Sequence, residues 1–257
     1  MFDYLPMSVK LYILTLAGFT GAMFGSAMNC LAYRMVHNQK WSGGRSACPH
    51  CGHVLKPYEL IPVVSFLLQK GRCRACGARL SIRYLATEAL LGVCYVTLVL
   101  RFGFTLDTVT HLVLTTCLLA LSLVDLDTQI IPHRFLLIPA ALRIAHIALT
   151  GAWTAMVPAL IFGGGLLALS LVMDKILKKD TMGGGDIKLM AVLGLYFTIP
   201  ECLLLLIIAC FAGIIIASVL MKIKDDTPFP FGPALAIAAY ITMLIGEPII
   251  GWYLSLF

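Results

Sequence analysis

Two acidic positions in this 257-residue chain carry residue types suited to acid–base chemistry. Asp186 follows the three successive glycines Gly183–Gly185 and lies between two apolar runs. Asp125 ends an earlier apolar run, and Asp127 and Ile131-Pro132 follow it closely. A carboxylate at the boundary of a lipid bilayer is costly to bury, so both positions are candidate functional sites.

Two carboxyl groups held close together in a shielded site share a proton, because one pKa rises. One member can then act as a base toward water while the other acts as an acid, which is the chemistry of aspartic peptide hydrolysis. The glycines before Asp186 would let an extended substrate backbone approach. Asp127 lies two residues from Asp125 and cannot occupy the same helical position, so we expect it to support or bind.

A plainer interpretation is that these acids are solvated helix caps, as acids at helix ends often are. The glycines, Ile131-Pro132 and a shared side of the membrane together favour function for Asp125 and Asp186. For Lys188, two residues after Asp186, two interpretations stay open. It either tunes the carboxylate charge or simply marks the side of the membrane on which its loop lies.

Four of the nine cysteines form a paired motif. Cys48 and Cys51 make one CxxC turn, and Cys73 and Cys76 make a second one after 21 intervening residues. Two such turns present four thiolates to one tetrahedral ion, which predicts a closed structural zinc site. A disulfide is a weaker alternative in a reducing cytosolic loop, and redox chemistry would not need two matched copies.

The elements that must position these residues are apolar. The chain is 60% hydrophobic and only 12% charged, whereas soluble domains are about 25% charged. We therefore predict an all-α polytopic membrane protein. About eight transmembrane helices are expected, at 11–32, 85–101, 106–124, 135–150, 153–173, 187–200, 201–221 and 231–256.

Charge predicts the topology. The net charge of +6 is not taken as a sign of nucleic-acid binding, because the basic residues lie in loops beside the apolar runs. The segment Tyr33–Arg83 holds nine Lys and Arg residues and one acid, Glu59, which makes it cytoplasmic and places the N-terminus outside. Alternation then puts loops 33–84, 125–134, 174–186 and 222–230 in the cytoplasm, where both aspartates fall.

This pattern predicts three parts: a first transmembrane helix at 1–32, a small cytoplasmic zinc-knuckle domain at 33–84, and a membrane aspartic peptidase domain at 85–257. The zinc domain is inserted between the first and second membrane helices. Zinc would fold a segment that can hardly build a hydrophobic core of its own.

The chain resembles the type IV prepilin leader peptidases, membrane aspartic peptidases also described as prepilin peptidase/N-methyltransferases. The resemblance covers nearly the whole chain and is highly specific where the cysteine knuckles and the glycine–aspartate element occur together. It rests, besides the four cysteines, on Gly25-Ser26, Asn29, Tyr33-Arg34, Glu59–Val63, Gly71–Cys73, Arg83-Tyr84, Glu88, Asp125–Asp127, Ile131-Pro132, Gly183–Leu189 and Pro230–Pro233. His133 departs from it, since the family more often has Asp or Asn there.

The resemblance implies that Asp125 and Asp186 are the catalytic pair. It implies a multi-pass protein of the bacterial cytoplasmic membrane that cleaves a short basic leader after glycine from prepilins or pseudopilins, at the cytoplasmic face. It also implies methylation of the new α-amino group by S-adenosylmethionine. The sequence has no glycine-rich methyltransferase fingerprint, so the residues of that site are unassigned and are expected within Tyr33–Arg83.

Two alternatives from other classes stay open. An ion or metal transporter would use the acids as a relay, although such acids usually lie at mid-membrane and in repeated halves. A non-catalytic assembly factor of a secretion machine would not need the acids at all. The sequence assigns no oligomeric state.

Overall fold

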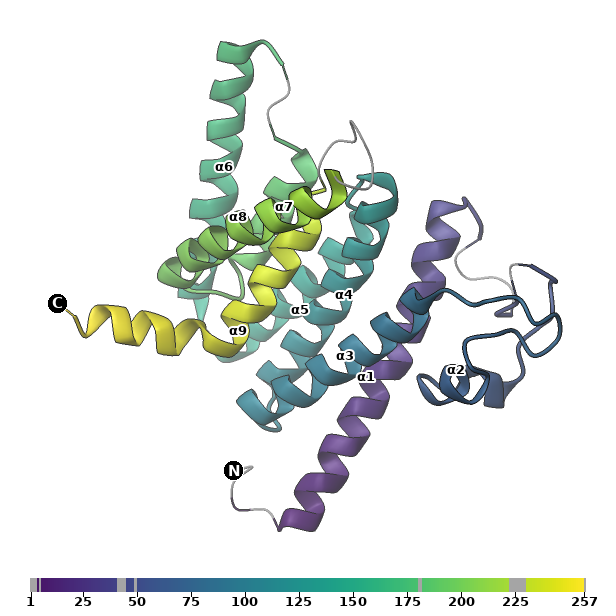
Figure 1. Cartoon of the computed structure of the whole chain (residues 1–257). Coiled ribbons are helices and arrows are strands. Elements are labelled where there is room, and N and C mark those ends of the chain that lie inside the picture. Colours follow the sequence, from purple (N-terminus) through teal and green to yellow (C-terminus); the bar gives the residue numbers. More distant parts are fainter. Residues whose placement is uncertain are drawn as a thin grey trace. The chain divides into compact units, whose positions relative to one another are not determined.

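The computed structural model describes residue 4 and residues 6–40, 45–48, 50–179, 182–221 and 230–256. Loop 222–230, expected in the cytoplasm, lies outside these residues except for Pro230. The described secondary structure is helical (Figure 1). The cysteine-rich segment also contains two isolated β-bridges. The chain divides into two compact units, Met1–Ala120 and Leu121–Phe257.

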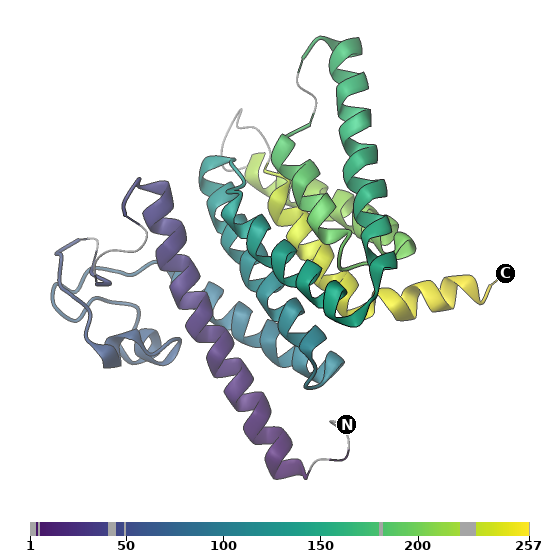
Figure 2. The ribbon, with the colours of Figure 1, turned by 180° about the vertical axis from the view of Figure 1, so that it is seen from behind.

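The first unit is built on α1 (Met7–Val36) and α3 (Ile82–Phe102), which lie side by side (Figures 1 and 2). Between them come the 3₁₀ turn η2 (Pro57–Leu60) and the short helix α2 (Val64–Leu68). The helix α4 (Leu106–Thr128) begins in this unit and ends in the second.

Glycines set the distance between α1 and α3. A Cβ atom on Gly21 would lie 2.6 Å from the carbonyl oxygen of Leu91, and one on Gly25 would lie 2.8 Å from that of Thr87. The same face is tied by a buried hydrogen bond in which Asn29 Nδ2 donates to Thr87 Oγ1 over 2.7 Å. Small residues along 11–32 therefore pack the first helix closely, as the sequence predicted.

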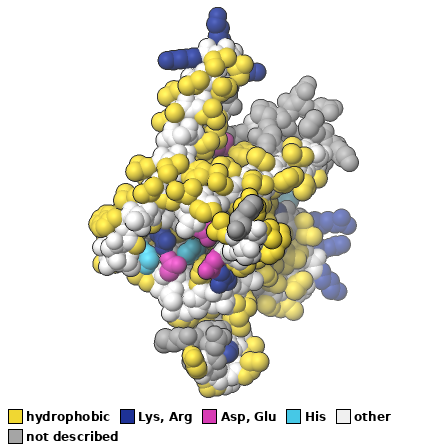
Figure 3. Space-filling view, turned by 90° about the vertical axis from the view of Figure 1, so that its left-hand side faces the viewer, with side chains coloured by type: hydrophobic (Ala, Val, Ile, Leu, Met, Phe, Trp, Pro, Cys, Tyr) yellow, Lys and Arg dark blue, Asp and Glu magenta, His cyan; other side chains and the backbone are white. Residues whose placement is uncertain are grey.

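The second unit holds the end of α4 and five further helices. These are α5 (Arg134–Thr150), α6 (Met156–Leu177), α7 (Gly184–Leu193), α8 (Ile199–Met221) and α9 (Gly232–Leu254), with the 3₁₀ turn η3 (Trp153–Ala155) before α6. Many large apolar side chains of α6 are exposed, and basic side chains gather at its far end (Figure 3). Such a surface suits lipid along the helix and water at its end.

Each of the eight predicted spans coincides with a helix, but the count of about eight transmembrane helices is not confirmed. Among the described residues, six stretches are long and apolar enough to cross a membrane: α1, α3, α4, Trp153–Leu177, α8 and α9. The other two helices are short: Gly151 in the left-handed conformation ends α5, and α7 begins within the glycine run at Gly184 and ends at Leu193. With 17 and 10 residues they span about 26 Å and about 15 Å of a hydrocarbon core about 30 Å thick.

Two sets of contacts fix α7, the helix that carries Asp186. A Cβ atom on Gly194 would lie 2.5 Å from the Cα atom of Ala159, so α7 ends directly against the backbone of α6. From α5, Arg143 Nε donates to the carbonyl oxygen of Leu195 over 3.1 Å, and its guanidinium lies 5.0 Å from the ring centre of Tyr196. Arg143 therefore neutralises the carbonyl end of this short helix.

We expect Gly194→Ala to destabilise the second unit by about 1–3 kcal/mol, because the added methyl group meets backbone atoms that cannot move aside. The backbone of Gly194 has φ −59°, which alanine adopts without strain, so the effect would come from space alone. Thermal unfolding in detergent would measure it. The matched control is Gly164→Ala on α6, where an added Cβ atom meets nothing within 4 Å. Equal stability of the two variants would contradict the close contact.

Candidate active site and cysteine cluster

Three helix ends in the second unit bring the candidate carboxylates together. Asp125 lies in the last turn of α4, Asp186 in the first turn of α7, and α9 begins beside them at Gly232. The helix α4 ends where Gln129 turns into the left-handed region (φ 59°) and its N–H donates to the carbonyl oxygen of Asp125. Pro132, three residues later, has no backbone N–H with which to continue the helix.

Asp125 is held by the backbone of α9. Its side chain is buried, with 3% of the residue exposed, and its Oδ2 accepts a hydrogen bond from the N–H of Gly232 over 3.0 Å. The first N–H groups of a helix have no partner within it and carry its positive dipole end, so they stabilise a carboxylate. A Cβ atom at position 232 would lie 2.6 Å from Oδ2, so the contact needs glycine.

Gly232 is a site residue that was not among the predicted site residues. The segment Pro230–Pro233 contributed to the family resemblance, but nothing in the sequence connected it to an aspartate 107 positions earlier. A glycine directly before Pro233, at the start of an apolar run, was the available signal, because proline favours the first turn of a helix.

Asp186 has the opposite environment. Its Oδ1 is buried and has no hydrogen-bond partner within the part of the chain that the structure describes. The short helix α7 is not among the candidate membrane spans. Burial, and secondarily the charge of Asp125, raise the pKa of Asp186 to about 6. The two carboxyl groups therefore interact electrostatically.

The remaining predicted positions around the pair divide into two groups. Gly183 caps α7, where a Cβ atom would lie 3.1 Å from Asp186 Oδ2, and a Cβ atom on Gly185 would lie 3.0 Å from Ile131 Cβ. Both glycines thus line the site. Asp127 and Lys188 are exposed.

Taken together, the pair consists of one carboxylate held by a backbone N–H and one carboxyl group with a raised pKa and an unsatisfied oxygen. Groups whose environments separate their pKa values can act as base and acid in one reaction. The unsatisfied Oδ1 of Asp186 offers a hydrogen-bonding position to a water molecule or a substrate atom. This arrangement suits hydrolysis without a covalent intermediate.

The four predicted zinc ligands come together in the first unit. The Sγ atoms of Cys48, Cys51, Cys73 and Cys76 all lie within 4.8 Å of one another, and the Cys48–Cys76 and Cys51–Cys73 pairs are each 4.0 Å apart. Zinc–sulfur bonds of about 2.3 Å in a tetrahedron place the sulfur atoms about 3.8 Å apart. The donor set and its spacing therefore fit zinc.

Two similar turns build this cluster. The N–H of Cys48 donates to the carbonyl of His53, and that of Cys73 donates to the carbonyl of Ala78. Each turn closes through a glycine with positive φ, Gly52 at 71° and Gly77 at 73°. Backbone N–H groups near Cys73, those of Cys76 and Ala75, lower the pKa of its thiol, which favours the thiolate that binds metal.

A helical membrane protein with a converging pair of aspartates and a four-cysteine cluster has the architecture of a membrane-embedded hydrolase with a cysteine-rich domain whose sulfur spacing fits zinc. The chain belongs to the type IV leader peptidase family. Residues 112–218 match that family, and residues 19–102 match the Bacterial Peptidase A24 N-terminal domain. No solved structure matches the chain significantly.

Relatives from several bacteria are similar over almost their whole length, and each is named prepilin leader peptidase/N-methyltransferase. The relative from Pseudomonas putida is 31% identical over 93% of this chain and 92% of its own. The one from Bacillus subtilis is 31% identical over 92% and 96%, and the one from Legionella pneumophila is 30% identical over 99% of each chain. This membership favours the peptidase hypothesis over the transporter and the assembly factor.

We expect Cys51→Ser to lower the zinc content from one ion per chain to a small fraction of that, and to unfold the segment around the knuckles, because a closed site tolerates no missing thiolate. Elemental analysis of the purified protein, with circular dichroism, would measure both effects. The control is Cys210→Ser, which changes an exposed cysteine of α8 outside the cluster. Full zinc content in Cys51→Ser would exclude the four-cysteine site.

Proposed function

We propose that this member of the type IV leader peptidase family uses Asp125 and Asp186 to cleave the short basic leader from prepilins or pseudopilins, and that it methylates the new N-terminus with S-adenosylmethionine. The observation that carries the catalytic assignment is the convergence of the two carboxyl groups with the N–H of Gly232, from three helices far apart in the sequence. Chemically, this is the arrangement that aspartic hydrolysis requires.

The two acids take different roles in this mechanism. Asp125, stabilised as a carboxylate by the Gly232 N–H, accepts a proton from the attacking water. Asp186, whose pKa is raised to about 6, holds the proton that passes to the leaving amine. Water adds to the peptide carbonyl, the C–N bond then breaks, and the products are a carboxylic acid on the leader and a free amine on the pilin.

In this proposal the glycines before Asp186 make room for the substrate. An extended peptide needs room beside Asp186, and Gly183–Gly185 present no side chain there. Lys188, exposed two residues beyond, is assigned to the membrane surface rather than to the reaction. Asp127 is assigned a supporting role toward the leader, whose basic residues an exposed carboxylate would attract.

The proposed topology keeps the N-terminus outside and the catalytic pair at the cytoplasmic face. Because α7 and α9 both begin beside the end of α4, the intervening chain must leave this side and return to it twice. The helices α5 and α6 would cross the membrane and return, and α7 and α8 would do the same. This supports eight membrane crossings, in which the turns at 194–198 extend the short α7.

The three-part division proposed from the sequence, at 1–32, 33–84 and 85–257, assigns the zinc a structural role in the cytoplasmic part. Lipid surrounds the apolar helices, and the apolar segment of the prepilin lies in the same bilayer. The proposed location is the bacterial cytoplasmic membrane, with the leader of the prepilin in the cytoplasm.

We expect Asp186→Asn to reduce leader cleavage by about 10²- to 10⁴-fold without loss of fold, because the amide cannot transfer the proton. Purified protein in detergent would be incubated with a prepilin and the shortened product quantified by mass spectrometry. Asp174→Asn on α6 is the control, since it removes a charge outside the site. Undiminished cleavage by Asp186→Asn would remove Asp186 from the mechanism.

A second prediction concerns Gly232→Ala. The new Cβ atom would lie 2.6 Å from Asp125 Oδ2 and would displace the carboxylate from its N–H partner, so cleavage should fall at least about tenfold. The comparison is Gly251→Ala on the same helix, where the added Cβ atom meets nothing within 4 Å. If the two variants cleave equally well, the backbone of α9 does not position Asp125.

A further inference from the structure

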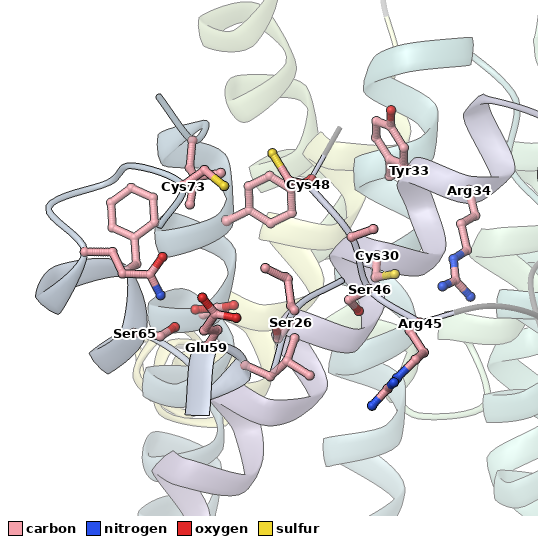
Figure 4. A pocket seen from close by; sticks show the side chains of 18 of the residues that line it. Ser26, Cys30, Tyr33, Arg34, Arg45, Ser46, Cys48, Glu59, Ser65 and Cys73 are labelled. Carbon is pink, nitrogen blue, oxygen red and sulfur yellow. The ribbon is translucent and has the colours of Figure 1, made fainter. Parts of the chain in front are cut away.

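The first unit contains a cavity of about 520 Å³ that the hydrolytic pair does not use (Figure 4). It lies between the second half of α1, the start of α3 and the segment that holds the cysteine cluster. Its volume is within the range of about 300–1,000 Å³ that small-molecule sites occupy. All its lining residues belong to the same compact unit, so it is a property of that unit alone.

Two buried carboxylates line this cavity. Glu88 is 7% exposed and its Oε2 accepts a hydrogen bond from the N–H of Val63 over 2.7 Å. Glu59 is 6% exposed; its Oε2 accepts from the N–H of Lys56 over 2.8 Å and lies 3.3 Å from His53 Nε2. The hydrogen bonds that hold the two carboxylates here are both accepted by Oε2. Buried carboxylates that line a cavity attract a cationic ligand.

The hydrogen bonds of Glu59 keep it charged. The N–H of Lys56, and next the ring of His53, lower its pKa. Glu59 is also the single acid in a segment, Tyr33–Arg83, with nine Lys and Arg residues. In such basic surroundings, two carboxylates that line one cavity form a distinct local site for positive charge.

The backbone beside Glu88 is strained. Val63 has φ 61° and ψ −53°, a conformation that β-branched residues rarely adopt, and the N–H of Val64 donates to the carbonyl of Pro62 over 2.6 Å. This γ-turn directs the Val63 N–H at Glu88 Oε2. Strain of this kind persists only where the surrounding structure enforces it, and it gathers at ligand sites. Here it fixes one oxygen of a carboxylate whose residue lines the cavity.

The cavity is also polarised. Glu59, Ser26 and Ser65 lie on one side of it, whereas Arg34 and Arg45 lie on the other (Figure 4). The rings of Tyr33, Tyr84 and Phe66 also line the cavity. A ligand that fits has a cationic centre, an anionic group some distance away and a flat ring. S-Adenosylmethionine has all three, as a sulfonium and an ammonium, a carboxylate and an adenine.

We propose that this cavity is the methyl-transfer site, in which Glu59 and Glu88 bind the cationic part of S-adenosylmethionine and receive the N-terminal amine of the cleaved pilin. This assignment rests on the proposed function, because the methyl acceptor is the product of leader cleavage. Neither carboxylate has a role in the hydrolytic reaction.

The step balances without a further reagent. The N-terminal ammonium first releases a proton to water, and its nitrogen then forms a bond to the methyl carbon while the methyl–sulfur bond breaks and its electron pair stays on sulfur. The positive charge thereby moves from sulfur to nitrogen, which ends as a methylated ammonium. Two fixed carboxylates that face both centres compensate this charge before and after transfer.

Glu88→Gln and Glu59→Gln test the proposal. Glutamine retains an oxygen that can accept the Val63 or Lys56 N–H, so the variants remove charge while keeping the local hydrogen bond. Calorimetry on the purified full chain in detergent would give the affinity for S-adenosylmethionine. We expect it to fall about tenfold or more in each variant. The pilin product should be cleaved as by the unaltered chain but lack the methyl group in mass spectrometry.

Zinc content and thermal unfolding would confirm that the variants fold, and Glu201→Gln on α8 is the matched control for a lost carboxylate. Unchanged donor affinity in both variants overturns the proposal. Independently of any variant, hydrogen exchange on the unaltered chain should show protection of 26–34, 59–66 and 80–88 when S-adenosylmethionine is added. Protection confined to other segments also overturns it. Donor binding without any leader cleavage would instead overturn the peptidase assignment.

Discussion

A carboxylate beside a bilayer persists only where the fold supplies a hydrogen-bond donor or a ligand for it, and this constraint shapes both units. Asp125 is paired with the first N–H of α9, and Glu88 is paired with the N–H of a strained turn. Asp186 has one buried oxygen without a protein donor. Each backbone partner comes from a distant segment, so the placement of these charges depends on the packing of whole helices.

Glycine makes that packing possible. At Gly21, Gly194 and Gly232 an added Cβ atom would lie within 2.6 Å of an atom of another segment. Gly21 sets the spacing of α1 and α3, and Gly194 allows α7 to end against α6. Gly232 leaves room for the Asp125 carboxylate. Gly164 and Gly251 have open surroundings, so glycine content alone does not reveal which positions matter.

The sequence predicted the features that depend on local pattern. The paired CxxC turns specify four ligands at fixed spacing, and the structure brings all four sulfur atoms together. Apolar runs located every long helix to within a few residues, since burial in lipid requires continuous apolar sequence. Charge in the loops also predicted that Asp125 and Asp186 lie at one face of the membrane, and this stays a prediction.

What escaped prediction depends on contacts between distant segments. The shortness of α7 follows from the glycine-rich stretch before it and from its end against α6 at Gly194, neither of which an apolar run reveals. Gly232 approaches Asp125 across 107 positions. Glu59 stood out in the sequence as the one acid of a basic segment and Glu88 only as part of a family resemblance, since the turn whose Val63 N–H binds Glu88 has no local sequence signature.

The chemistry also orders the two proposed reactions. Before cleavage, the nitrogen of the future N-terminus belongs to a peptide bond, and its lone pair is delocalised into the carbonyl group. Such a nitrogen is neither a nucleophile nor a cation, so the two carboxylates have no attraction for it. Hydrolysis turns it into an amine that is largely protonated near neutral pH, which the carboxylates of Glu59 and Glu88 attract. The charge created by the first reaction is therefore the property that the second site recognises, and methylation of an uncleaved prepilin is excluded without any gate or signal between the sites.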